Sequence, residues 1–387
     1  MKTISTGLFC DSFSPVVDGV TTTVSNYARL LGISFGPATV ITPSAPGYID
    51  DEVFTVLRYL SIPTIVRPPY RIGLPHLDAR LARTLAKSGF SILHAHSPFG
   101  AGHIALETAR KKGIPIIATF HSKYRDDLLR VVPIKAVVDR EIEHIVDFLY
   151  SVDQVWVPQE AVVSVLREYG YRGPYEVVEN GIDLAPPPDI EPYRTRGQAG
   201  LGVPENSLVG LYVGQHTIEK NIEFLVRSLP KVMEAVPNFR MVFVGRGYAR
   251  NQMKGLAAKL GFVDRIMFHD TVLNREMLKD IYARADLFLF PSFYDNAPLV
   301  IREAAAFRTP ALLLKESTAS EVIDDEMNGF LAENDSQAFS TRIIDILMNP
   351  QLITTAGKGA QETLCRSWQD VLVEVQERYM SILSRWV

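Results

Sequence analysis

Cysteine is scarce in this chain of 387 residues, which contains only Cys10 and Cys365. Their positions do not have the short spacing of a metal-binding pair, and two cysteines are too few for a disulfide framework. Basic charge is not in excess either, because 40 Lys and Arg stand against 44 Asp and Glu, for a net charge of −4. A protein dedicated to nucleic acid carries a basic excess, so we expect no nucleic-acid partner.

Long apolar runs are also absent. No stretch approaches the 18 apolar residues of a membrane-spanning helix, and the N-terminal sequence MKTISTGLFCDSFSP lacks the apolar core of a secretory signal. We therefore expect a cytoplasmic protein whose contact with a membrane, if it has one, is peripheral. The content of 47% hydrophobic and 22% charged residues is typical of globular proteins.

Short apolar runs alternate with helical patterns along nearly the whole chain. This alternation predicts an α/β fold with parallel sheets covered by helices. The alternation pauses at 183–192, where four of ten residues are proline, and proline is excluded from helix interiors and central strands. We predict two Rossmann-like, doubly wound domains, 1–183 and 197–367, joined by a hinge at 184–196 and facing each other across a ligand-binding cleft.

The first candidate binding segment lies between the first predicted strand and the first predicted helix. It reads Asp11-Ser-Phe-Ser-Pro-Val-Val-Asp-Gly-Val-Thr. A glycine just before a helix lets backbone amides approach an anion, where the helix dipole also favours negative charge. Gly19 is the residue that we place nearest a phosphate. The alternative is a tight turn that only needs a small residue.

The second candidate segment, Val213-Gly-Gln-His-Thr-Ile-Glu-Lys-Asn, follows the first predicted strand of the second domain. Lys220 lies where its ammonium group could meet a diphosphate at the mouth of a cleft. The alternative is a surface lysine in the first turn of a helix, where a cation is slightly unfavourable. That mild misplacement favours a functional role.

The third candidate segment begins at Pro291, where a predicted strand ends, and a helix is expected to start near Pro298. Proline suits the first turn of a helix and leaves the following amides to face an anion. Asp295 and Glu303 are eight residues apart, one in the loop and one on the helix. Such a pair could hold two hydroxyl-rich parts of one ligand, a sugar and a ribose, although Asp295 could also simply cap the helix.

Together these segments resemble glycosyltransferase family 4, whose members are retaining enzymes with the two-domain GT-B fold. Each matching fragment is short, but their number and order cover nearly the whole chain. The fragments are Asp18-Gly-Val, His94-Ala-His-Ser-Pro-Phe-Gly, Thr119-Phe-His-Ser, Glu179-Asn-Gly-Ile-Asp, Val213-Gly, Glu219-Lys-Asn, Phe243-Val-Gly-Arg-Gly, Ala285-Asp-Leu-Phe-Leu-Phe-Pro-Ser and Asn328-Gly-Phe-Leu. The resemblance also implies that 368–387 form a last helix crossing back onto the first domain.

The resemblance implies a role for each matching residue in binding the donor. Gly19 and Lys220 would bind the diphosphate, Glu303 would bind the ribose, and His121 would lie beside the sugar. The backbone amides that would cradle the phosphate belong to Asn296, Ala297, Pro298, Leu299 and Val300. Two positions depart from the family: Gln215 replaces an arginine near the diphosphate, and Asp295 replaces a glutamate that contacts sugar hydroxyls.

The implied activity is retaining transfer of a hexosyl group from a UDP- or GDP-sugar to a hydroxyl acceptor, with His121, Lys220 and Asp295 as catalytic residues. The resemblance implies no metal and no cofactor, because the lysine and helix N-termini can neutralise the leaving diphosphate. Two alternatives stay open. The chain could be a catalytically weakened nucleotide-sugar-binding protein, as Gln215 and Asp295 would allow, or a sugar-nucleotide epimerase.

The acceptor is expected to bind the first domain, and one basic stretch there suggests a lipid. Its positive residues are Arg67, Arg71, Arg80, Arg83 and Lys87, and Leu77, Leu81 and Leu85 share its predicted helical segment. A basic amphipathic helix can rest on an anionic membrane surface, so the stretch predicts a membrane lipid or glycan acceptor. The alternative is an ordinary solvated helix face.

Overall fold

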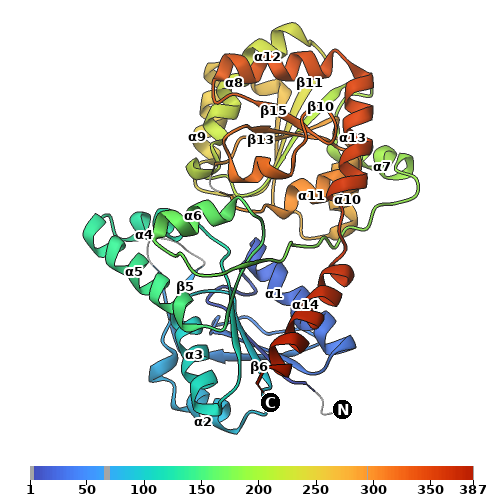
Figure 1. Ribbon diagram of the computed structural model, residues 1–387. Coiled ribbons are helices and arrows are strands. Elements are labelled where there is room, and N and C mark those ends of the chain that lie inside the picture. The colour runs from blue at the N-terminus through green and yellow to red at the C-terminus, as the bar shows by residue number, and fades with distance from the viewer. Residues whose placement is uncertain (1–3, 65–69, 294, 387) are drawn as a thin grey trace. The chain divides into compact units, whose positions relative to one another are not determined.

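The computed structural model describes residues 4–64, 70–293 and 295–386, and these residues form two compact units (Figure 1). The first unit comprises Met1–Gly181 and Trp368–Val387, and the second comprises Ile182–Ser367. The first unit ends two residues earlier than the predicted domain boundary at 183. The reason is that the Ile182 amide donates to the Arg366 carbonyl at 2.9 Å, within the second unit.

A seven-stranded sheet forms the centre of the first unit, and all of its strand pairs are parallel. Its strands are, in spatial order, β3 (Thr55–Tyr59), β2 (Ala38–Pro43), β1 (Thr6–Phe9), β6 (Ile92–Ala95), β7 (Ile116–Thr119), β8 (Gln154–Val157) and β9 (Glu176–Val177). Strand β1 pairs with β2 on one side and with β6 on the other, so the strand order reverses at β1. A separate antiparallel pair joins β4 (Ser61–Pro63) to β5 (Arg71–Gly73).

Helices cover this sheet because its central strands are apolar on both faces, as parallel sheets require. All four residues of β1, β6 and β7 are buried. The helices are α1 (Gly19–Ser34), η1 (Pro75–Leu77), α2 (Ala79–Lys87), α3 (Gly100–Lys112), α4 (Tyr124–Val131), α5 (Lys135–Ser151), α6 (Val162–Tyr169) and α14 (Trp368–Ser384). The C-terminal helix α14 lies beside α1, where the Trp368 and Tyr27 rings meet edge to face at 6.1 Å (Figure 1).

The second unit has a six-stranded sheet that is also entirely parallel. Its spatial order is β12 (Ile266–His269), β11 (Phe239–Val244), β10 (Leu208–Val213), β13 (Leu287–Phe290), β14 (Ala311–Leu314) and β15 (Phe330–Ala332). The helices are α7 (Glu191–Leu201), η2 (Ile218–Lys220), α8 (Ile222–Ala235), α9 (Arg250–Lys259), η3 (Val263–Arg265), α10 (Arg275–Arg284), α11 (Leu299–Ala306), η4 (Thr318–Val322), α12 (Ser336–Leu347) and α13 (Pro350–Leu364). Numbered from its first strand, the order is 3-2-1-4-5-6, the doubly wound arrangement of dinucleotide-binding folds.

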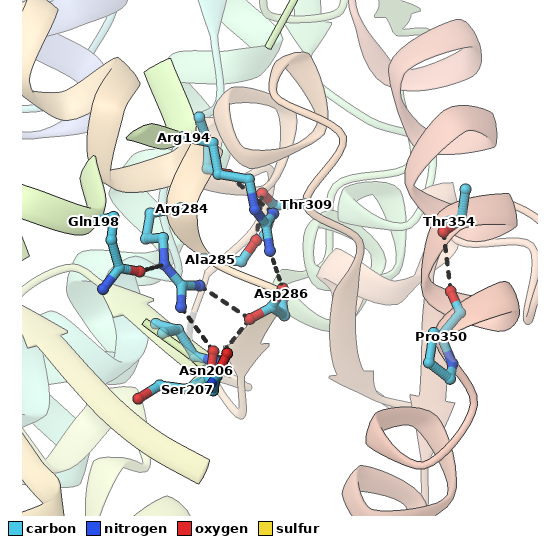
Figure 2. A network of polar contacts seen from close by, with 12 residues as sticks. Arg194, Gln198, Asn206, Ser207, Arg284, Ala285, Asp286, Thr309, Pro350 and Thr354 are labelled. Carbon is cyan, nitrogen blue, oxygen red and sulfur yellow. Dashed lines mark hydrogen bonds and ion pairs between the residues drawn. The ribbon is translucent and has the colours of Figure 1, made fainter. Parts of the chain in front are cut away.

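The predicted hinge at 184–196 is wrong in its second half, because α7 begins at Glu191. Pro192 lies in the first turn of this helix, where a missing amide hydrogen costs nothing. Figure 2 shows why the segment folds onto the unit: Arg194 from α7 and Arg284 from α10 both reach Asp286. Arg284 also donates to Gln198 of α7 and, at 2.7 Å, to the Ser207 carbonyl.

Candidate functional site

The second unit places its candidate residues in the loops that follow β10 and β13. These two strands are neighbours at the point where the strand order reverses. In doubly wound sheets, ligands bind beyond the carboxyl ends of the strands at this point, because the two loops diverge to opposite faces. Gln215 and Lys220 follow β10, and Asp295 follows β13.

Lys220 and Asp295 form an ion pair, although they are 75 residues apart in the sequence. Lys220 is the last residue of η2, and its side chain is 14% exposed, whereas that of Asp295 is 18% exposed. Water therefore screens this pair only in part. The second carboxylate oxygen of Asp295 is buried and accepts no hydrogen bond from any described residue. The pair thus combines a cation with an oxygen that can accept from a ligand.

The segment after Asp295 leads into the N-terminus of α11. The Asp295 carbonyl accepts from the Thr318 hydroxyl at 2.7 Å, and the Asn296 side chain is buried. The helix begins at Leu299, so Pro298 is its N-cap and does not lie in its first turn as expected. Pro298 also has no amide hydrogen, so the prediction that its amide would donate to a phosphate is wrong.

Glu303 lies on α11 in a second, buried network. One carboxylate oxygen accepts from Arg275 at 2.7 Å, and the other accepts from the Tyr282 hydroxyl at 2.9 Å. Burial, reinforced by Glu303, raises the pKa of Tyr282 well above its usual value, so its hydroxyl stays a donor. Burial acts to lower the pKa of Arg275, but Glu303, with smaller effects of Asp183 and Tyr282, outweighs it and raises that pKa. These two bonds therefore hold the Glu303 carboxyl group in one orientation.

The loop after β10 packs tightly against the loop after β11. A Cβ atom on Gly247 would lie 2.1 Å from the His216 carbonyl oxygen, so only glycine fits at this position. His216 itself is fully buried between aromatic rings, and burial, with a smaller effect of Arg250, lowers its pKa to about 4. Gln215 carries no charge, but its carbonyl is held by the Tyr212 hydroxyl at 3.1 Å. The close packing fixes the path of the segment that leads to Lys220.

In the first unit, His121 follows β7 and precedes α4, at the carboxyl end of the sheet. Its Nε2 atom lies 3.0 Å from Nδ1 of His96. Burial lowers the pKa of His121 to about 4, although Asp18 opposes this shift. His121 is therefore neutral at pH 7, and its imidazole can act there as a hydrogen-bonding group but not as a cation.

Gly19 is the first residue of α1 and is exposed, and a Cβ atom there would meet nothing within 4 Å. The residue before it, Asp18, caps the helix by accepting from the Thr21 amide at 2.8 Å. This carboxylate already neutralises part of the positive potential of the helix N-terminus. A diphosphate near the Gly19 amide would have to approach a negative side chain.

The basic stretch does not form the predicted amphipathic surface. Leu81 and Leu85 are buried in the core of the unit, so α2 itself has no apolar face left for a membrane. Of the three predicted leucines only Leu77, in η1 just before α2, is exposed, at 71%. Arg71 donates to the Ser61 hydroxyl at 2.7 Å instead of joining α2, and Arg67 lies outside the described residues. The described cations on the exposed face of α2 are Arg80, Arg83 and Lys87. They can contribute electrostatic attraction alone.

The described residues contain neither a candidate membrane span nor a candidate metal cluster. In residues 4–64, 70–293 and 295–386, no helix combines the length and hydropathy required to cross a bilayer. Over the same ranges, no group of three or more histidine, cysteine, aspartate or glutamate side chains is arranged to hold a metal ion.

Comparisons with known proteins agree with this architecture. The family model described as Glycosyltransferase Family 4 matches residues 17–186, and the one described as Glycosyl transferases group 1 matches residues 194–363. The chain is 25% identical over 330 residues to an alpha-monoglucosyldiacylglycerol synthase of Streptococcus pneumoniae, covering 84% of this chain and 74% of that protein. It is 24% identical over 369 residues to the protein of the same name from Acholeplasma laidlawii, covering 92% and 91%.

Among solved structures, HepE of Anabaena in complex with UDP and glucose has a TM-score of 0.79 at 17% identity, covering 98% of this chain and all of that one. The fold and the matched segments define a glycosyltransferase with the GT-B fold. The chain belongs to glycosyltransferase family 4.

The sequence analysis did not predict the side chains that hydrogen-bond to two of the candidate site residues, Glu303 and His121. Arg275 and Tyr282 bind Glu303, and His96 binds His121. One signal was available: the His94-Ala-His96 pattern places two histidines on the same face of a strand. The positions of Arg275 and Tyr282 carried no such signal, because they lie on a different helix, 28 and 21 residues from Glu303.

Proposed function

We propose that this glycosyltransferase transfers a hexosyl group from a nucleoside-diphosphate sugar, UDP- or GDP-linked, to a hydroxyl acceptor with retention of anomeric configuration. The observation that carries the proposal is the Lys220–Asp295 pair beyond the carboxyl ends of β10 and β13. The lysine offers a cation for a diphosphate, and the buried second oxygen of Asp295 offers an acceptor for a sugar hydroxyl.

In the proposed reaction, Lys220 neutralises charge that develops on the departing diphosphate. At about 4 Å and an effective dielectric constant near 20, one such charge pair is worth on the order of 4 kcal/mol. About 1.4 kcal/mol corresponds to a tenfold change in rate, so even part of this energy matters if it is realised only in the transition state. The amides of 296, 297, 299 and 300 add oriented dipoles, and together these groups take the place of a metal ion.

The remaining residues keep the roles that the family resemblance implies. Glu303 binds ribose hydroxyls, and its buried network with Arg275 and Tyr282 supports this role by fixing the carboxylate. In the first unit, the Gly19 amide binds the diphosphate, and His121 donates a hydrogen bond to the sugar. For retention we propose that the acceptor attacks from the face that the diphosphate leaves, with the diphosphate helping to take the acceptor proton.

The donor and acceptor classes are suggested by the relatives. HepE was solved with UDP and glucose, and the two bacterial relatives are named for a glucosylated diacylglycerol. We therefore propose UDP-glucose as the first donor to test, and diacylglycerol in a membrane as the first acceptor, with glycans as the second class. The protein would then act at the inner face of the membrane.

A panel of UDP- and GDP-sugars tests the donor proposal through thermal stabilisation of the protein and slow hydrolysis of the sugar nucleotide. We expect one donor to raise the melting temperature and to be turned over, and Lys220→Ala and Glu303→Ala to abolish both responses. Lys231→Ala is the matched control, because this lysine lies on α8 and donates to Thr341 on the surface. An unchanged response in Lys220→Ala would contradict the assignment.

The same panel separates the alternatives. A sugar-nucleotide epimerase would isomerise a donor without any acceptor, whereas a catalytically weakened binding protein would be stabilised by a donor without turning it over. Either result would overturn the proposal.

Vesicles test the acceptor proposal. We expect glucosyl transfer to diacylglycerol in anionic vesicles, with stronger sedimentation at low salt than at high salt, because α2 can attract lipid headgroups only through charge. Replacing Arg80, Arg83 and Lys87 together by glutamine should reduce sedimentation. Transfer to a soluble glycan with no binding to anionic vesicles would contradict the lipid proposal.

A further inference from the structure

Three histidine side chains of the first unit lie in contact at the carboxyl ends of β6 and β7. His94 is in β6 and His96 follows it two positions later, on the same face, and both side chains are completely buried. Their rings stack with centroids 4.1 Å apart and an interplanar angle of 26°. The His121 ring in turn stacks on the His96 ring, with centroids 5.3 Å apart. The histidines therefore form a continuous chain that ends at the residue assigned to the sugar.

His94, at the end of the histidine row away from His121, is held by the C-terminal helix. His94 Nδ1 lies 2.7 Å from the Tyr379 hydroxyl on α14, and His94 Nε2 lies 2.7 Å from the Thr119 hydroxyl. Because both ring nitrogens are engaged, the His94 ring cannot rotate without losing a buried hydrogen bond. The orientation of His94 in turn limits the ring stacked on it, His96.

The bond between His96 and His121 determines where their protons lie. Burial lowers the pKa of His94 and of His96 well below the usual value, and that of His121 to about 4, so all three rings are neutral. A neutral imidazole has one donor and one acceptor nitrogen. One of the two nitrogens joined at 3.0 Å must therefore donate to the other.

The surroundings of His96 favour one of the two arrangements. Its Nε2 atom is buried and has no hydrogen-bond partner among the described residues. If His121 were the donor, the proton of His96 would be on this Nε2 atom, as a buried donor without an acceptor, which proteins rarely tolerate. If His96 donates from Nδ1, its Nε2 is a bare acceptor, and the proton of His121 lies on Nδ1.

We propose that Tyr379, His94 and His96 are positioning residues that hold His121 in the tautomer protonated on Nδ1. In this state His121 Nε2 already accepts from His96, so His121 cannot take a proton there as a general base and acts through a donor N–H. The C-terminal helix is then part of the machinery that orients His121. The catalytic consequence rests on the proposed function, whereas the tautomer does not.

Nitrogen NMR of the histidine-labelled full chain tests the tautomer directly. The His121 signals are assigned by their loss in His121→Gln. We expect a protonated Nδ1 and an unprotonated, hydrogen-bonded Nε2 in the wild type. His96→Leu should mix or invert this tautomer, whereas His96→Asn should preserve it, because the asparagine amide can place an N–H near the position of Nδ1. A proton on Nε2 of His121 in the wild type, or the same tautomer in His96→Leu, would overturn the inference.

Kinetics with the donor identified by the panel test the positioning role. We expect Tyr379→Phe and His96→Leu to lower kcat roughly tenfold, about the effect of one lost positioned hydrogen bond, with little change in KM. His96→Asn should recover most of this loss. His144→Asn is the control, since His144 lies on α5, half exposed and paired with Glu141, and its kcat should be that of the wild type.

The outcomes separate the two proposals. Wild-type kcat in both Tyr379→Phe and His96→Leu would overturn the positioning role while leaving the transferase proposal intact. If the wild type turns over no nucleotide sugar, the proposed function fails, and the NMR result alone decides the tautomer.

Discussion

The Asp295 side chain forms an ion pair with Lys220 and is also the proposed acceptor for a sugar hydroxyl. In the described structure one of its oxygens is paired with Lys220, and the other is buried without a hydrogen-bond partner among the described residues. A bound diphosphate would share this lysine with a carboxylate of like charge, which raises the electrostatic cost of binding. Under the proposed function, the aspartate would therefore reduce the affinity for the leaving group while it supplied an acceptor for the sugar.

We predict that Asp295→Asn tightens binding of the free nucleoside diphosphate and slows sugar transfer. The charge that competes for Lys220 is removed, so affinity should rise by roughly tenfold, the equivalent of about 1.4 kcal/mol. Calorimetry with UDP or GDP measures the affinity, and turnover is measured with the matching donor. Weaker nucleotide binding in Asp295→Asn would show that the aspartate does not compete for the lysine.

The buried histidines predict that the first unit is sensitive to acid. Burial lowers the pKa of His121 to about 4 and those of His94 and His96 well below 6.5. Below about pH 6.5 the unfolded chain binds more protons than the folded one, so stability is full above this pH and falls as the pH decreases toward 4. We expect a loss on the order of 1 kcal/mol per pH unit for each histidine that titrates only on unfolding.

Urea denaturation at pH 7, 6 and 5 measures this dependence. His96→Asn should flatten it, because one titrating group is removed. Equal slopes for the wild type and His96→Asn would contradict the prediction.

Helix α7 forms although the proline-rich sequence around its start predicted a linker. Those prolines lie before it and in its first turn, but the helix is fixed by contacts with residues 86 and 92 positions later. Arg194 of α7 pairs with Asp286, and Gln198 accepts from the buried Arg284 (Figure 2). The sequence reveals local propensity, and these tertiary partners outweighed it.

Two glycines of α7 provide a matched test of this packing. A Cβ atom on Gly197 would lie 2.1 Å from the Asp280 carbonyl oxygen of α10, whereas one on Gly200 would meet nothing within 4 Å. We expect Gly197→Ala to lower the free energy of unfolding by about 1–3 kcal/mol. Gly200→Ala should raise it by about 0.5–1 kcal/mol, because alanine favours the helix. Equal effects in urea denaturation would contradict the contact between α7 and α10.

At the scale of the whole molecule, the fold class and the family could be predicted from the sequence. Apolar runs at regular intervals predicted both parallel sheets, and local motifs placed Lys220 and Asp295 in loops after strands. What could not be predicted depends on long-range pairing: Tyr379 meets His94 across 285 residues, and Arg275 meets Glu303 on another helix. The amphipathic surface predicted for the basic stretch did not form for the same reason, because Leu81 and Leu85 pack into the core.

The two units have separate hydrophobic cores, and the chain passes between them after Gly181 and again before Trp368. The second unit holds Lys220, Asp295 and Glu303, and the first holds Gly19 and His121. The proposed function gives all five residues a part in one reaction, so it concerns the chemistry of the whole chain and not the binding properties of either unit.

Proton NMR of the product, recorded during turnover of the donor selected by the panel, is the decisive test of this proposed reaction. We expect the sugar joined to the acceptor hydroxyl to have the same anomeric configuration as in the donor. A product of inverted configuration, or no transferred sugar with any UDP- or GDP-sugar and either acceptor class, would contradict it.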